Sequence, residues 1–146
     1  MNTPKTLLFL HVLSEQDRRK LESFFSEKEK ALLRFDGIYA CPDTGRFYDY
    51  LCFEKNGKVH RVSSNGTPDQ IASWIKNPEK AAVWRGTYKI SGSSHISFSL
   101  RDKNDFSMEY NGTIEKDRLV LDVNSVTYGD QKMGQVYRFR DVDAWK

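Results

Sequence analysis

The spacing of hydrophobic residues changes once along the chain, near residue 35. Before that point apolar side chains recur every three to four residues among many charges, which indicates an amphipathic helix. Ser14 is the expected N-cap, with Asp17 three residues later in the arrangement of a capping box. The apolar positions of this helix are Leu21, Phe24, Phe25, Leu32 and Leu33. We expect it to pack against the domain or close one end of it, and partner binding is the alternative.

From Asp36 onward apolar and polar residues alternate, which is the period of half-buried strands. The pattern predicts about eight strands joined by short turns, the first over residues 37–41. One short helix is expected near residues 68–76. Thr67-Pro68-Asp69-Gln70 supplies an N-cap threonine, a proline at the first helical position and a glutamine at the third.

The clearest early hairpin signal is Asn56-Gly57, which lies between the predicted strands 47–54 and 58–64. This dipeptide favours a two-residue type I′ turn, because both of its central residues need a positive φ. Such a turn places His60 opposite Phe53, on the apolar side of the hairpin.

Three later turns are expected at Gly92-Ser93-Ser94, at residues 102–104 and at Lys116-Asp117. They bring apolar and aromatic residues together in cross-strand pairs on one face: Ile90 with Ile96, Tyr88 with Phe98, Leu100 with Phe106, Phe98 with Met108, Ile96 with Tyr110, Ile114 with Leu119, and Tyr110 with Val123. A slip of one residue would turn an apolar set toward water, so this agreement favours these registers. Tyr137 and Phe139 belong to a final strand.

Eight strands that each carry one apolar face must curl around that face or stack as two sheets. Sequential hairpins with short connections favour an up-and-down antiparallel barrel, and a two-sheet sandwich is the alternative. We therefore expect a mainly β single domain over residues 1–146. It consists of an N-terminal helical segment over residues 1–35 and a β-barrel over residues 36–146.

Composition and charge argue against several classes of partner but do not identify one. The formal net charge of +3 is too small to predict binding of nucleic acid or of an anionic membrane. Cys41 and Cys52 are expected to be two reduced thiols, since two cysteines make no disulfide framework. The apolar run over residues 6–13 is too short to span a membrane and no small-residue cleavage site follows it, so a cytoplasmic protein is expected.

Several segments resemble those of a known family. They are Gly37-Ile38-Tyr39, Tyr50-Leu51-Cys52-Phe53 before Asn56-Gly57, Ser63-Ser64, Gly86-Thr87-Tyr88 and Tyr110-Asn111-Gly112. Over about residues 36–140 this arrangement resembles a lipocalin-like (calycin) barrel, in particular the β domain that follows the F-box in some ubiquitin-ligase adaptors. The resemblance implies a barrel that binds a small apolar molecule. It does not carry over an adaptor role, because the N-terminal segment does not resemble an F-box.

Two positions depart from related barrels. Tyr39 stands where lipocalins carry the tryptophan of a Gly-x-Trp motif. The last strand reads Tyr137-Arg138-Phe139-Arg140, without the Arg-x-Tyr carboxylate clamp of intracellular fatty-acid-binding proteins.

The leading functional hypothesis is a non-enzymatic protein that binds a small hydrophobic molecule in the barrel lumen. The expected ligand contacts are His60, Tyr88, Phe98, Met108, Tyr110 and Tyr137, with His60 near a polar end of the ligand. The tyrosine hydroxyls either meet that polar end or bond to each other in a filled core. No cofactor is expected, and the three histidines lack the spacing of a metal site.

Two other classes of function stay open. A filled barrel would act through its surface, with another protein or a second copy of the chain as partner. A small enzyme would use His60 and a lumen tyrosine as acid and base. Gly92-Ser93-Ser94-His95 is better explained as a hairpin turn than as a nucleophile.

Overall fold

The computed structural model describes residues 14–17, 19, 33–80 and 82–145. The chain divides into two units, residues 1–31 and residues 32–146. In the first unit residues 15–17 and 19 are helical, and Ser14 Oγ accepts a hydrogen bond from the Asp17 amide at 3.1 Å. The N-cap prediction is thereby confirmed. Predicted helix positions Leu21, Phe24, Phe25 and Leu32 lie outside the described residues.

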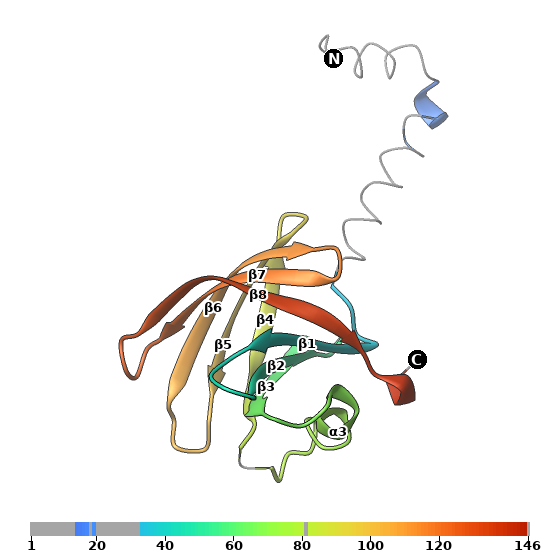
Figure 1. The fold of residues 1–146 in the computed structure, drawn as a ribbon. Helices are drawn as coiled ribbons and strands as arrows, with labels where there is room; N and C mark the ends of the chain where they lie inside the picture. The colour runs from blue at the N-terminus through green and yellow to red at the C-terminus, as the bar shows by residue number, and fades with distance from the viewer. Residues whose placement is uncertain (1–13, 18, 20–32, 81, 146) are drawn as a thin grey trace. The chain divides into compact units, whose positions relative to one another are not determined.

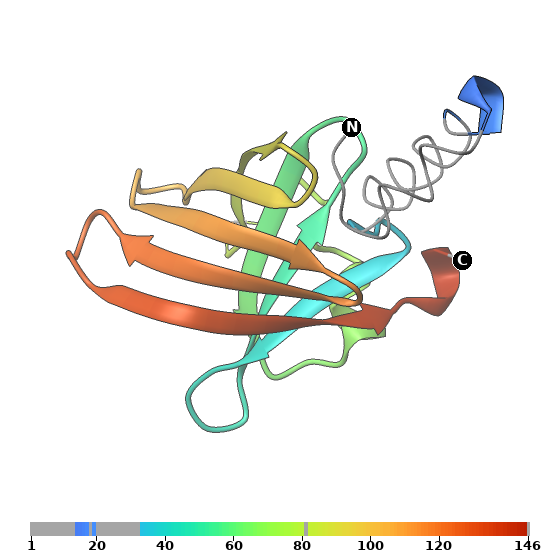
Figure 2. The same cartoon turned by 90° about the horizontal axis from the view of Figure 1, so that it is seen from above.

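Eight antiparallel strands form a closed barrel in the order of the sequence (Figures 1 and 2). The strands are β1 (Gly37–Pro42), β2 (Tyr48–Phe53), β3 (Lys58–Ser64), β4 (Trp84–Ser91), β5 (His95–Arg101), β6 (Ser107–Glu115), β7 (Arg118–Ser125) and β8 (Gln131–Asp141). Pairing of β1 with β8 closes the barrel. The predicted up-and-down barrel is confirmed, and the sandwich alternative is wrong.

The short helix α3 (Pro68–Ala72) lies between β3 and β4, and a 3₁₀ turn, η1 (Asp143–Trp145), follows β8. The predicted capping box is present: Thr67 Oγ1 accepts from the Gln70 amide, and Gln70 Oε1 accepts from the Thr67 amide. The helix ends earlier than expected. The Ser73 hydroxyl donates to the Gln70 carbonyl at 2.7 Å, and this bond competes with the helical ladder.

Two hydrophobic clusters lie on the two sides of the barrel wall. The inner cluster fills much of the lumen and includes Tyr39, Leu51, Phe53, Phe98, Leu100, Tyr110, Leu119, Leu121 and Tyr137. The outer cluster joins the outward residues of β1–β3 to α3 and the segments near it, and includes Ile38, Tyr50, Cys52, Val62, Ile71, Ile75, Val83 and Val142. Figure 1 shows α3 beside these strands. Strands β1–β3 are therefore buried on both faces.

Two of the later hairpins have the predicted registers. Ile90 pairs with Ile96 across the turn at residues 92–94, and Ile114 pairs with Leu119 across Lys116-Asp117. Ile90 was expected in the core but is 44% exposed, because it lies near the tip of its hairpin.

The hairpin between β5 and β6 differs from the prediction by two residues. Leu100 pairs with Met108 instead of Phe106, and Phe98 pairs with Tyr110 instead of Met108. Asp102 extends the loop, since its carboxylate accepts from the Phe106 amide at 3.0 Å. A shift of two keeps every side chain on its predicted face.

The hairpin between β2 and β3 differs by one residue, which has larger consequences. The Glu54 amide donates to the Lys58 carbonyl at 2.9 Å and Gly57 has φ +93°, so the loop holds three residues rather than two. Cys52, and not Phe53, pairs with His60. Because side chains alternate along a strand, His60 turns to the outer face and Arg61 turns inward.

Residues 33–36 close the end of the barrel that carries the β6–β7 turn. Leu33 and Phe35 join the inner cluster. The backbone amide of Arg34 donates to the Tyr39 hydroxyl at 3.0 Å, and its guanidinium lies 3.8 Å from the centre of the Phe139 ring. Ion pairs of 2.8 Å to Asp36 and Asp117 hold the guanidinium there.

Burial raises the pKa of Tyr39 from 10 to about 12. The unfolded chain releases this proton first, so the free energy of unfolding should fall as pH rises from about 10 to about 12, by ~1.4 kcal/mol per pH unit for this group. Urea unfolding across that range measures the slope. Tyr39→Phe should flatten it by about one proton, and equal slopes in the two proteins would contradict the assignment.

Gly86 allows β4 and β5 to approach closely, because an added Cβ would clash with the Ser99 carbonyl oxygen. We expect Gly86→Ala to lower the free energy of unfolding by about 1–3 kcal/mol. Thr87→Ala, at the exposed next position, is the matched control and should stay within about 0.5 kcal/mol of the parent. Urea unfolding of both variants makes the comparison, and similar values for the two would refute the packing argument.

Candidate functional site

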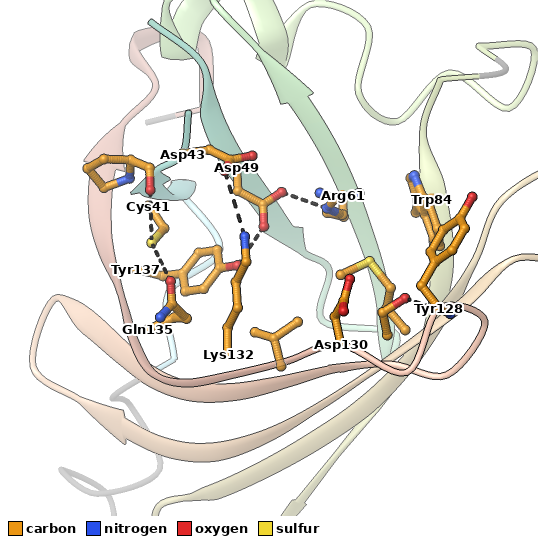
Figure 3. A pocket seen from close by; sticks show the side chains of 14 residues that line it. Cys41, Asp43, Asp49, Arg61, Trp84, Tyr128, Asp130, Lys132, Gln135 and Tyr137 are labelled. Atoms are coloured by element: carbon orange, nitrogen blue, oxygen red, sulfur yellow. Dashed lines mark hydrogen bonds and ion pairs between the residues drawn. The ribbon is translucent and has the colours of Figure 1, made fainter. Parts of the chain in front are cut away.

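A cavity of about 230 Å³ opens at the end of the barrel opposite residues 33–36, between the β1–β2 and β7–β8 loops (Figure 3). Its apolar and aromatic lining comes from Trp84 of β4, Met108 of β6, Val123 of β7 and Tyr128 of the β7–β8 loop. The lumen is therefore filled over part of its length and hollow at one end.

A buried polar network forms one wall of this cavity. Arg61 Nε donates to Asp49 Oδ1 at 2.6 Å, and the Tyr137 hydroxyl donates to Asp49 Oδ2, also at 2.6 Å (Figure 3). The side chains of Arg61 and Asp49 are only 13% and 12% exposed. The Arg61 guanidinium carbon lies 5.3 Å from the centre of the Trp84 ring. These contacts join β2, β3, β4 and β8 around one arginine.

Strand alternation explains why these polar side chains point inward. Asp49 precedes the inward Leu51 by two residues in β2, and Arg61 follows the inward Val59 by two residues in β3. Tyr137 faces the same lumen from β8.

The charges of the network depend on one another. Burial raises the pKa of Asp49, and the Arg61 charge and the Tyr137 hydrogen bond oppose that rise by stabilising the carboxylate. Burial alone would lower the pKa of Arg61, but the Asp49 carboxylate helps to raise it above its ordinary value. Burial and Asp49 together raise the pKa of Tyr137 well above its usual range, so this hydroxyl stays a donor at neutral pH.

The rim of the cavity carries further charge. Lys132 Nζ lies 3.8 Å from Asp43 Oδ1, and Asp130 also lines the cavity. With Arg61 and Asp49 included, two cationic and three carboxylate side chains line the cavity. Its lining has one excess formal negative charge when all five are ionised.

Of the predicted ligand contacts, Met108 and Tyr137 line the cavity. Phe98 and Tyr110 stack with ring centres 4.5 Å apart inside the core. Tyr88 packs against Phe53, and its hydroxyl donates to the Glu54 carbonyl at 2.6 Å. The Tyr88 hydroxyl has a partner of its own, whereas the hydroxyls of Tyr110 and Tyr137 lie close together: a side-chain hydrogen bond with Tyr137 lowers the pKa of Tyr110 against the larger rise caused by burial.

His60 lies on the outer face of the barrel wall, so its predicted position beside Phe53 in the lumen is wrong. It is 5% exposed, and its Nε2 lies 2.6 Å from Glu54 Oε2. Within the described part of the chain its Nδ1 has no hydrogen-bond partner. Because His60 and the lumen tyrosines lie on opposite sides of the wall, they do not form the acid–base pair that an enzyme was expected to use.

Cys41 and Cys52 are free thiols, as the sequence predicted, and both are buried rather than half-buried. Cys41 faces the cavity and Cys52 belongs to the outer cluster, so the barrel wall separates them. Burial raises the pKa of both thiols.

Replacing Asp49 and replacing Arg61 should lower the free energy of unfolding by different amounts. Asp49→Leu leaves a guanidinium that cannot shed its charge, so we expect a loss of about 3 kcal/mol in the free energy of unfolding. Arg61→Met should cost less, because the Asp49 carboxyl can take up a proton. Urea unfolding of both single variants and of the double variant tests the coupling. The double variant should be more stable than Asp49→Leu alone, and additive losses would contradict a coupled pair.

Among the described residues, no helix combines the length and apolar character needed to cross a bilayer. Comparison with known proteins finds no family model, no curated protein and no solved structure that matches this chain.

Proposed function

We propose that this protein binds a small, largely apolar molecule in the cavity at the open end of the barrel. The observation that carries the proposal is an apolar and aromatic hollow built around one buried ion pair. Ligand pockets are mostly lined in this way, with a few polar groups that fix orientation. The cavity, at about 230 Å³, lies below the range of roughly 300–1,000 Å³ that suits drug-sized ligands, so a smaller molecule is expected.

The resemblance to calycins supports the same function, since an eight-stranded barrel has room for one small ligand. We also propose that the chain is a calycin and that it acts in the cytoplasm. The short strand connections and the closed β1–β8 seam support the calycin assignment.

A second candidate function is a protein contact through the β7–β8 hairpin. Three of its large apolar side chains are exposed: Val126 by 50%, Tyr128 by 66% and Met133 by 67%. Tyr128 also lines the cavity, so this surface and the ligand site share a residue.

The methionine methyl groups provide a direct test of ligand binding. Met108 lines the cavity, whereas Met133 is exposed and outside its lining. In NMR spectra of methyl-labelled protein, titration with toluene should shift the Met108 signal and leave that of Met133 in place. Toluene is a suitable probe because dry apolar cavities of about 150 Å³ bind benzene.

A filled cavity provides the control. Val123→Trp should weaken toluene binding by at least about tenfold by occupying the space, and Val126→Trp, on the exposed loop, should not. The proposal fails if Met108 responds neither to toluene nor to a benzene ring with a polar end group in the parent protein, or if both tryptophan variants bind toluene equally well.

A further inference from the structure

The side chain of Arg61 has hydrogen-bond donors that its protein contacts do not use. Its Nε–H is bound to Asp49, but its two terminal Nη groups make no hydrogen bond with any described residue. A guanidinium has five N–H donors and no acceptor. This side chain is 13% exposed and lines the cavity, and its unused donors reach solvent there, because His60 Nδ1 is the one fully buried side-chain nitrogen or oxygen without a partner among the described residues. A ligand oxygen in the cavity can replace that water as their acceptor.

The neighbouring groups do not compete for that role. Asp49 accepts from Arg61 at one oxygen and from Tyr137 at the other. The Tyr137 proton is committed to Asp49 as well. This wall of the cavity therefore offers donors to a ligand more readily than acceptors.

Charge decides which kind of acceptor fits. Asp49 already balances the Arg61 charge, and Lys132 lies beside Asp43. A ligand carboxylate would add a further negative charge to a lining that already carries an excess of one. Removing an ion from water is costly unless a free opposite charge meets it, and neither cation of this lining lacks a carboxylate neighbour. An uncharged oxygen accepts the same hydrogen bonds without that cost.

Resting on the ligand-binding function proposed above, we propose that the ligand is an uncharged molecule with a carbonyl or amide oxygen that accepts from the Arg61 Nη groups. Its apolar body lies against Trp84, Met108 and Val123, which belong to the apolar part of the lining. The class includes small aromatic or aliphatic amides and ketones. It excludes long-chain fatty acids by both size and charge.

Three probes with one ring and different end groups test this assignment on the full chain at pH of about 7: benzamide, benzoate and benzylamine. Toluene, which has no polar end, is the reference. Methyl NMR of Met108 gives each affinity. We expect benzamide to bind at least about tenfold more tightly than benzoate or toluene, because hydrogen bonds to a charged donor discriminate by that much.

Variants identify the donor. Arg61→Met should reduce benzamide to the affinity of toluene, while Lys132→Met should keep the preference for benzamide. Asp49→Asn should improve benzoate relative to benzamide, because it removes the buried negative charge. If Arg61→Met does not fold, guanidinium NMR of the parent protein replaces it: the Arg61 Nη signals should move with benzamide and not with toluene.

The outcomes separate the two proposals. Toluene binding with no preference for benzamide, or tightest binding of benzoate or benzylamine, overturns the amide assignment and leaves the ligand cavity standing. A preference that survives in Arg61→Met overturns the role of the arginine. Absence of binding by all four probes overturns the proposed function itself.

Discussion

The register of β3 depends on the loop at residues 55–57, and the candidate site depends on that register. Gly57 at φ +93° allows a three-residue loop, which pairs Glu54 with Lys58. Every side chain of β3 then has a fixed side of the barrel wall. Arg61 enters the lumen beside Asp49, and His60 is placed outside. With a two-residue loop the barrel would hold an imidazole in place of a guanidinium, and its chemistry would differ.

The sequence predicts which face each residue of β4–β8 occupies, because one face of these strands is exposed to water. Outward positions of these strands are mostly polar, such as Lys89, Ser99 and Glu109, so a slip of one residue would expose an apolar set. The β5–β6 error of two residues shows the limit of this constraint. A shift by an even number keeps each residue on its face, and the position of the turn is then decided by the local hydrogen bonds of Asp102.

In strands β1–β3 neither face is exposed to water in this way. Outward residues such as Tyr50, Cys52 and Val62 are as apolar as inward ones, because α3 covers them. Either register buries hydrophobic side chains, so alternation alone does not choose between them. Asp49 and Arg61 lie on these strands, and for that reason sequence reasoning named Met108 of β6 and Tyr137 of β8 but missed the ion pair of the cavity. Asp49 and Arg61 each lie two residues from an inward apolar residue, Leu51 or Val59, and therefore share its face. This spacing predicts the ion pair once the length of the β2–β3 loop, and with it the register, is known.

The cavity lies where the inner aromatic packing ends. Below the cavity Tyr39, Phe53, Phe98 and Tyr110 meet ring against ring, with centres 4.5–5.7 Å apart along the chain of contacts. This packing limits the depth of the cavity, and the Asp49–Arg61 pair occupies part of its wall. A buried ion pair of this kind stabilises a fold poorly compared with apolar residues of the same volume. Its position beside the hollow end of the lumen agrees with the proposal that it offers hydrogen bonds to a bound molecule.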